Sequence, residues 1–249
     1  MGSAPAALAA VVALGALAFG TAAASAPRKL LVVSVTKGYR HESIPAAERL
    51  VEALGRESGL YSVDFARTDE DLLAKTTRKA LEGYDGVFFA NTTGDLPLAD
   101  REAFLAWIAE GHAFLGIHSA TDTYHGYPPF VAMLGGEFAY HKEQVKVDAM
   151  VEDPKHPATS HLGGGVSVFD EIYVMKSFDK ARVKPLLSLD KHPNTGEPGY
   201  FPLAWTREEG KGRVFYTAFG HREDVIGADW YRRHVLGGIR WALRADSAP

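Results

Sequence analysis

Three histidines follow directly on short apolar segments of the chain. His41 lies in "GYRHES" behind the apolar segment 30–35, His118 comes straight after "AFLGI", and His221 ends "GRVFYTAFGH". Grouped neutral imidazoles bind zinc and other divalent metals, and imidazoles also act as general acids and bases because their pKa lies near working pH. We therefore expect these three histidines to form one polar site, and both chemistries are open at this point.

The predicted cofactor is one divalent metal, with zinc as the first choice and His41, His118 and His221 as its ligands. Glu223 lies two residues beyond His221 and is expected to coordinate the metal or orient a histidine. His118, His221 and Glu223 form the predicted catalytic set. A bound metal would activate water or polarise a carbonyl group. The sequence has no H-x-x-x-H pair, so a metal-free site in which the histidines transfer protons is the alternative.

Aromatic, hydroxyl and acidic residues occur in the segments that follow the same apolar stretches. Aromatic faces combined with a few hydrogen-bonding side chains suit carbohydrate ligands, although tyrosine is also common in ordinary loops. The residues expected to contact the substrate are Tyr39, Arg40, Asn91, Thr92, Asp122, Tyr124 and His141. The acidic pair Asp170-Glu171 belongs to the same polar set. The expected ligand is a small sugar.

These residues need a scaffold that brings distant parts of the chain to one edge. Short β-branched apolar segments alternate with amphipathic segments of about ten or more residues, which predicts βαβ units and a parallel sheet. The predicted strands are 30–35, 61–66, 84–90 and 113–117, and the predicted helices begin after Ser43 and cover 69–81 and 98–110. Ligands of such sheets bind beyond the carboxyl ends of the strands, where the polar residues lie.

Residues 135–210 interrupt this alternation. The segments "EQVKVDAMVED", "VFDEIYVM" and "PLLSLD" are predicted as strands of a mixed or antiparallel section, joined by Gly- and Pro-rich loops such as "HPNTGEPGY". A core strand in "GRVFYTAFGH" and a helix over 230–243 follow. We predict a single α/β domain over 27–249, doubly wound, with a mostly parallel sheet, helices on both faces and an elaborated middle section.

Composition and the first residues narrow the function classes. The net charge is −4 and no basic stripe is present, so nucleic acid is not an expected partner. The chain has no cysteine, which excludes disulfides, thiolate ligands and a cysteine nucleophile. Residues 1–26 hold an apolar, Ala-rich stretch followed by small residues. They predict a signal peptide and a periplasmic or secreted protein without a membrane anchor in the mature form, with a disordered Ala-rich leader or a membrane-retained anchor as the alternative.

Several motifs together resemble the ThuA-like family, named for trehalose utilisation. They occur in the family's order over nearly all of the mature chain: "GYRHES", "GIHSATDTY", "LGGEFAYH", "DPKHPATSHL", "DEIY", "PLAWTREEGKGRVFYTAFGH" and "GGIRWAL". The resemblance implies a flavodoxin-like fold similar to class I glutamine amidotransferases, which carry a cysteine at the elbow after a core strand and H-P-E after a late strand. Here His118 stands at the elbow and His221-Arg222-Glu223 replaces H-P-E. Cysteine-dependent amidotransferase activity is therefore excluded.

The family resemblance further implies a role in the catabolism of trehalose, related disaccharides or their keto derivatives. The leading hypothesis is an exported hydrolase or lyase that acts on a glycoside through the His-rich site. The main alternative is a non-catalytic carbohydrate-binding protein that uses the same cleft. A third hypothesis is an interaction domain that kept the fold without its chemistry, because fold alone does not carry function. A homodimer is compatible with the aromatic loops.

Overall fold

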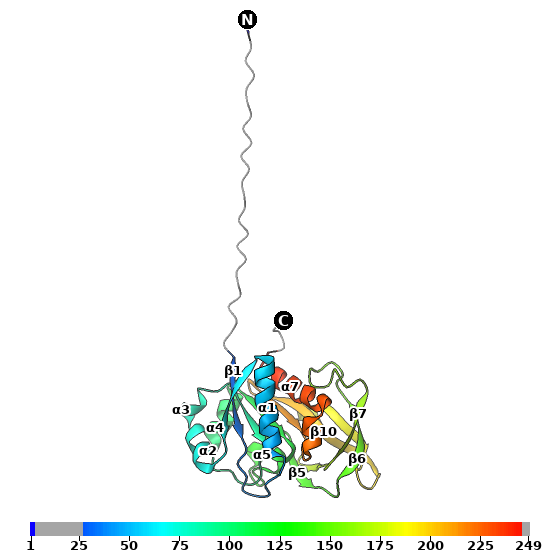
Figure 1. Cartoon of the computed structure of the whole chain (residues 1–249). Helices are drawn as coiled ribbons and strands as arrows, with labels where there is room; N and C mark the ends of the chain where they lie inside the picture. Colours follow the sequence, from blue (N-terminus) through cyan, green and yellow to red (C-terminus); the bar gives the residue numbers. More distant parts are fainter. Residues whose placement is uncertain (3–26, 246–249) are drawn as a thin grey trace.

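A nine-stranded sheet runs through the computed structural model, which describes residues 1–2 and 27–245 (Figure 1). Five parallel strands lie in the order β2 (Tyr61–Ala66), β1 (Arg28–Val33), β3 (Gly86–Ala90), β4 (Ala113–Ile117) and β11 (Gly212–Thr217). Four antiparallel strands continue the sheet as β10 (Pro198–Glu209), β9 (Lys184–Lys191), β6 (Val145–Val151) and β7 (Gly165–Asp170). A separate antiparallel pair joins β5 (Glu137–Tyr140) to β8 (Val174–Lys176). The parallel strands have the flavodoxin-like order, so the predicted fold class is confirmed.

Alternation of side chains along the parallel strands builds two cores, one on each face of the sheet. In β1, Leu30 and Val32 belong to one core and Leu31 and Val33 to the other, and all four are fully buried. The first face is covered by α1 (Ile44–Ser58), α6 (Glu223–Gly227) and α7 (Asp229–Ala242). The second face is covered by α2 (Asp69–Lys75), α3 (Arg78–Leu81), α4 (Arg101–Ala109) and α5 (Pro128–Leu134). Strands covered on both faces are apolar throughout, which explains their unbroken apolar sequences.

Three element predictions differ from the structure. The segment "VFDEIYVM", predicted as one strand, is divided between the end of β7 and the start of β8, which belong to different sheets. The predicted helix 69–81 is two short helices, because the Thr76 hydroxyl donates to the Leu72 carbonyl (2.6 Å) and Thr77 caps the N-terminus of α3. β10 begins inside the predicted loop "HPNTGEPGY". Proline cannot donate to a β-ladder, yet the register of β10 against β9 shifts next to Pro198 and Pro202, and these irregularities accommodate both residues.

The predicted signal peptide falls largely on residues 3–26, which lie outside the described residues. Among the residues that the structure does describe, none belongs to a helix long and apolar enough to cross a membrane. Export and the single-domain organisation therefore stay predictions. In Figure 1 the antiparallel strands β6 and β7 lie at one end of the sheet, and β1 with the neighbouring α2 and α3 lies toward the other.

Candidate metal centre

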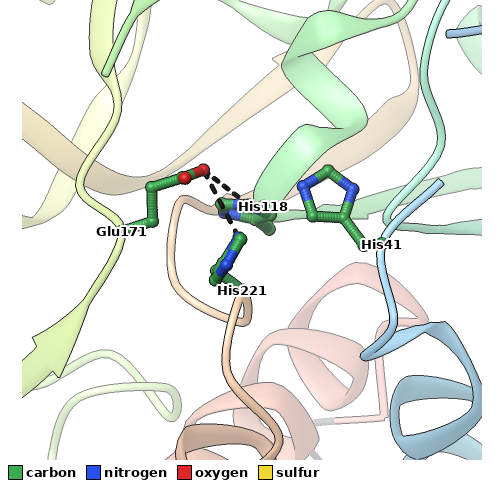
Figure 2. Close-up of side chains that lie close together, drawn as sticks. All are labelled: His41, His118, Glu171 and His221. Atoms are coloured by element: carbon green, nitrogen blue, oxygen red, sulfur yellow. Dashed lines mark ion pairs between the residues drawn. The ribbon is translucent and has the colours of Figure 1, made fainter. Parts of the chain in front are cut away.

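The three predicted histidines meet beyond the carboxyl ends of β1, β4 and β11. The ring centroids of His41 and His118 are 4.8 Å apart, those of His41 and His221 are 5.4 Å apart, and those of His118 and His221 are 5.3 Å apart (Figure 2). The parallel strands bring together residues separated by up to 180 positions, since 221 − 41 = 180. The predicted convergence of the histidines is therefore present in the structure.

A carboxylate that was expected in the polar set, but not among the metal ligands, completes the group. Glu171 follows β7, and its Oε1 lies 3.5 Å from His118 Nε2 and 3.4 Å from His221 Nδ1 (Figure 2). Together with His41 these residues make a group of four. Each of the four offers one ligand atom, and the four atoms all lie within 4.8 Å of one another. The antiparallel extension of the sheet thus supplies the fourth member of a cluster whose other three members come from the parallel half.

The turn that carries His118 is tight and strained. His118 has φ 44°, which is uncommon for a residue with a side chain and marks stored backbone strain. A Cβ atom at Gly116 would lie 2.8 Å from the Ala120 Cβ, so only glycine allows the 3₁₀ turn η1 (His118–Asp122) to fold back onto β4. His118 Nδ1 lies 2.9 Å from the Ala218 carbonyl oxygen, to which it donates. That bond leaves Nε2 as the ring atom that faces Glu171.

A buried carboxylate holds the loop that carries His221. Asp170 is fully buried, and it accepts hydrogen bonds from the backbone N–H groups of Gly220 (2.8 Å) and Arg222 (3.2 Å). It also accepts the N–H of Glu171 (3.0 Å). Burial raises the pKa of Asp170 above its usual value. Through these bonds one side chain fixes the backbone on both sides of His221 and next to Glu171.

The protonation states of His41 and Glu171 suit a cation, whereas the raised pKa of His221 favours the protonated ring, which must lose its proton to bind one. Burial and the neighbouring imidazoles of His118 and His221 lower the pKa of His41 to about 3, so this ring is neutral at neutral pH. Burial opposes ionisation of Glu171, but its contacts with His118 and His221 outweigh burial and hold the pKa of the carboxyl well below its usual value. Contact with Glu171 raises the pKa of His221 against the effect of burial. A neutral imidazole and an ionised carboxylate are the forms that bind metal.

Two buried ring nitrogens without hydrogen-bond partners also fit a metal site. His118 Nε2 and His221 Nδ1 are buried and make no hydrogen bond within the described part of the chain. Buried polar atoms without partners cost free energy, and each such atom calls for an explanation. Three imidazole nitrogens and one carboxylate oxygen form a ligand set that suits zinc and other first-row divalent metals. A divalent cation shared by these four residues would satisfy both atoms.

Two cavities meet at this cluster, and each has a volume of about 330 Å³. The inner cavity lies over the cluster and is lined by Tyr39, His41, Asp122, His141, Glu171, Tyr173 and His221. The outer cavity is lined by Tyr39, Glu42, Ser43, Gln144, His221, Arg222, Glu223 and Asp224. Tyr39 and His221 border both, so the cavities form one bipartite site.

Several residues predicted to contact substrate do line these cavities. Tyr39 is exposed and borders both cavities, Asp122 borders the inner one, and His141 Nδ1 lies 3.1 Å from Glu171 Oε2. Glu223 borders only the outer cavity and is exposed, because the chain turns into α6 at this residue. The carboxylate position beside the histidines, which the sequence analysis gave to Glu223, belongs to Glu171.

Other predicted substrate contacts have packing roles instead. Asn91, Thr92 and Tyr124 are fully buried, and neither cavity reaches them. Asn91 Nδ2 donates to the Gly220 carbonyl (3.0 Å), and the Tyr124 hydroxyl donates to a backbone carbonyl. Arg40 is exposed but borders neither cavity. The contact of these four residues with substrate stays a prediction that neither cavity supports. Polar residues at strand ends also satisfy the turns that follow the strands.

Comparisons with known proteins agree with the fold. The model of the ThuA family, described as trehalose utilisation, matches residues 29–242. No curated protein is significantly similar in sequence to the chain. A ThuA-like protein from Bacteroides uniformis is similar in structure, with TM-score 0.72, 22% identity and coverage of 92% of this chain and 98% of the other.

Two further solved structures share the fold. A ThuA-like protein from Parabacteroides merdae has TM-score 0.72, 17% identity and coverage of 90% of this chain and 92% of the other. A β-galactosidase from Bacillus circulans sp. alkalophilus has TM-score 0.56 and 14% identity, and the match covers 88% of this chain but only 31% of that enzyme. At such identities the likeness concerns the fold alone.

Proposed function

The chain belongs to the ThuA family, and from this premise we propose that it is a metal-dependent enzyme that cleaves the glycosidic bond of a disaccharide or its keto derivative, by hydrolysis or by elimination. The observation that carries the proposal is the cluster of His41, His118, Glu171 and His221 at the base of the inner cavity. The predicted signal peptide adds export to the periplasm or the medium as part of the proposal.

The four clustered residues would hold one divalent cation, with zinc as the first choice. When bound, such a cation supplies Lewis-acid polarisation of a substrate oxygen or lowers the pKa of a water molecule. The rest of the work falls to the chain. Asp170 orients the loop of His221, and the Ala218 carbonyl fixes the ring of His118. These contacts hold the ligand atoms in place before the cation arrives.

The two cavities support a substrate made of two sugar units. They have similar volumes, and they share a border at Tyr39, a residue that is 65% exposed. The outer cavity exposes mainly polar surface and the inner cavity mainly apolar surface. An exposed aromatic ring between the two cavities suits the apolar face of a sugar ring, while Gln144 and Glu42 in the outer cavity offer hydrogen bonds to hydroxyl groups. Asp122 and His141 in the inner cavity would contact the unit nearest the cluster.

A non-catalytic carbohydrate-binding protein is the second candidate. The outer cavity supports it, because its hydrogen-bonding side chains are independent of the cluster, with the exception of His221. The two candidates differ in one respect that can be measured: a binding protein leaves the sugar intact however long it is incubated.

The experiment combines product analysis with metal dependence. Protein stripped with a chelator and reloaded with zinc or manganese is incubated with trehalose and with 3-keto-trehalose, and released monosaccharides are followed by mass spectrometry. We expect product only after reloading, none with His118→Ala, and normal amounts with His161→Ala as the matched histidine control, because His161 borders neither cavity. Binding without product would favour the second candidate. Turnover by chelator-treated protein would contradict the metal role.

A further inference from the structure

A second group of titratable side chains lies beside the inner cavity, outside the four clustered residues. The ring of His125 sits between two carboxylates: its Nε2 lies 2.5 Å from Asp122 Oδ1, and its Nδ1 lies 3.0 Å from Glu137 Oε2. Asp122 borders the inner cavity. Glu137 lies on β5 and points away from that cavity's border toward β8, where Lys176 Nζ lies 3.5 Å from its Oε1.

The position of His125 is fixed by the residue before it. Tyr124 has φ 58°, a strained conformation for a residue with a large side chain. Its hydroxyl donates to the Leu96 carbonyl (2.8 Å), and the Arg101 guanidinium lies 4.6 Å from the centre of its ring. Its backbone N–H donates to the Gly94 carbonyl (3.2 Å). A buried anchor thus maintains a strained turn whose next side chain is His125, and strain of this kind is typical of functional segments.

The contacts of His125 with two carboxylates require one additional proton. A neutral imidazole has one N–H and one bare nitrogen, and an ionised carboxylate only accepts hydrogen bonds. Both ring nitrogens of His125 face a carboxylate oxygen at hydrogen-bond distance. Two such bonds therefore need one proton more than a neutral ring with two ionised carboxylates contains. Burial opposes ionisation of Glu137, but its contacts with His125, Ser177 and Lys176 hold the pKa of this carboxyl below its usual value. The additional proton therefore lies either on His125 Nε2 or on Asp122 Oδ1, which face each other across 2.5 Å.

We propose that Asp122 is the general acid of the reaction and that His125 is the positioning residue that holds Asp122 at the cavity wall and resupplies its proton. The proposal rests on the bond cleavage proposed above. Asp122 gives the shared proton to the glycosidic oxygen while the carbon–oxygen bond breaks and its electron pair stays on that oxygen, so the second sugar leaves as an alcohol. In hydrolysis the oxygen of a water molecule bonds to the anomeric carbon and that water loses a proton to the solvent, whereas in elimination the neighbouring carbon loses a proton and a carbon–carbon double bond forms. His125 Nε2 is then without a proton; it takes one up from water and returns it to Asp122.

Surroundings and exposure suit this transfer. The His125 side chain is 37% exposed, so water reaches the ring, whereas the Glu137 side chain is only 12% exposed and anchors its far side. The charged groups that face His125 among the described residues are Asp122 from η1 and Glu137 from β5, with Lys176 of β8 behind Glu137. Ser177 also donates to Glu137 (3.0 Å), which keeps this carboxylate in its acceptor role.

The first test uses leaving-group dependence, a readout that a purely structural role would not move. A poor leaving group needs a proton from an acid, and a nitrophenolate does not. For His125→Asn we expect kcat on the disaccharide substrate to fall about 100-fold, with KM and bound metal unchanged, and kcat on the matching 4-nitrophenyl glycoside to change much less. The pH profile of the variant should lose the limb that reports the acid. Equal losses on both substrates, or no loss, would overturn the proposal.

A second variant and a second readout guard against a folding defect or an inactive preparation. Glu137→Gln leaves the His125 side chain in the protein and removes the carboxylate charge that anchors it. We expect kcat on the disaccharide to fall more than kcat on the 4-nitrophenyl glycoside, as for His125→Asn, but by a smaller factor. In ¹⁵N-histidine spectra of the full chain we expect a ring-nitrogen chemical shift that reports a proton shared between His125 Nε2 and Asp122, lost in His125→Asn and in Asp122→Asn and kept in His161→Asn. This spectrum can be recorded without turnover. If the wild type lacks the signal, the proposed proton transfer between His125 and Asp122 is overturned. If the wild type shows the signal but no turnover, only the proposed function is refuted.

Discussion

Replacing Asp170 with asparagine should weaken metal binding without touching any ligand. The carboxylate is fully buried and accepts three backbone N–H groups, from Gly220 (2.8 Å), Arg222 (3.2 Å) and Glu171 (3.0 Å). Asparagine has nearly the same shape, but its NH₂ group cannot accept a hydrogen bond. At least one of the three N–H groups loses its acceptor and faces a second donor instead. The backbone beside His221 or at Glu171 must then shift.

The size of the effect follows from the bonds that are lost. A hydrogen bond to a charged group contributes about 1.5–3 kcal/mol, and a buried donor without a partner costs about 1–3 kcal/mol. The two values describe partly the same loss, so they are not simply added. Burial also raises the pKa of Asp170, which reduces the advantage of its ionised form. We therefore expect Asp170→Asn to lower the free energy of unfolding by about 2–4 kcal/mol. Loss of a residue that orients ligands typically lowers metal affinity about 10- to 100-fold. We expect a loss in this range for zinc.

The assay measures both quantities on the same samples. Urea unfolding gives the stability of the metal-free protein, and competition with a chromophoric chelator gives the zinc affinity. The matched control is Val168→Ala, which removes buried methyl groups from the same strand β7 without a hydrogen bond to the 220–222 loop. We expect it to lose stability and keep its affinity. If Asp170→Asn also keeps wild-type affinity while it loses stability, the argument that Asp170 positions the ligands is refuted.

Three further predictions concern stability. Burial lowers the pKa of His234 to about 3, so the unfolded chain binds a proton that the folded protein refuses, and stability falls as pH falls below about 6.5. Urea unfolding should show a loss of about 2 kcal/mol between about pH 7.5 and pH 5 from this residue, and His234→Gln should flatten that dependence. Gly220→Ala should cost about 1–3 kcal/mol in thermal unfolding, because φ is +119° and the new Cβ would lie 2.7 Å from the Tyr231 hydroxyl oxygen; an unchanged Tm would contradict this. Tyr124→Phe should lower stability by about 1–2 kcal/mol through the unpaired Leu96 carbonyl, while direct loss of sugar affinity at equal stability would contradict its buried role.

The parallel half of the fold could be predicted because its physical signals are local. Leu30 to Val33 are buried on both faces of the sheet, so the segment is apolar without interruption, and the strand is visible in the sequence. The same holds for Ala113 to Ile117, whose bounds as a strand are those of the prediction. Because parallel strands present their carboxyl ends at one edge, His41, His118 and His221 could be expected to meet.

Glu171 could not be placed in the same way. It follows an antiparallel strand at the far end of the sheet, and the rule for carboxyl ends of parallel strands does not apply there. Its route to the histidines depends on hydrogen bonds between Asp170 and the backbone at Gly220, which are contacts over about 50 residues and leave no periodic pattern. One signal was present: the charged pair Asp170-Glu171 interrupts the apolar run "VFDEIYVM". A strand predicted to end at Asp170 would have drawn attention to it.

The most direct test of the account is the metal content of paired glutamate variants. Protein purified without chelator is analysed by inductively coupled plasma mass spectrometry as wild type, Glu171→Gln and Glu223→Gln. Glu171 lies beside His118 and His221, whereas Glu223 is exposed and borders only the outer cavity. The account predicts one divalent metal ion per chain in the wild type and in Glu223→Gln, and a large loss in Glu171→Gln. Wild-type protein without metal, or a loss confined to Glu223→Gln, would contradict it.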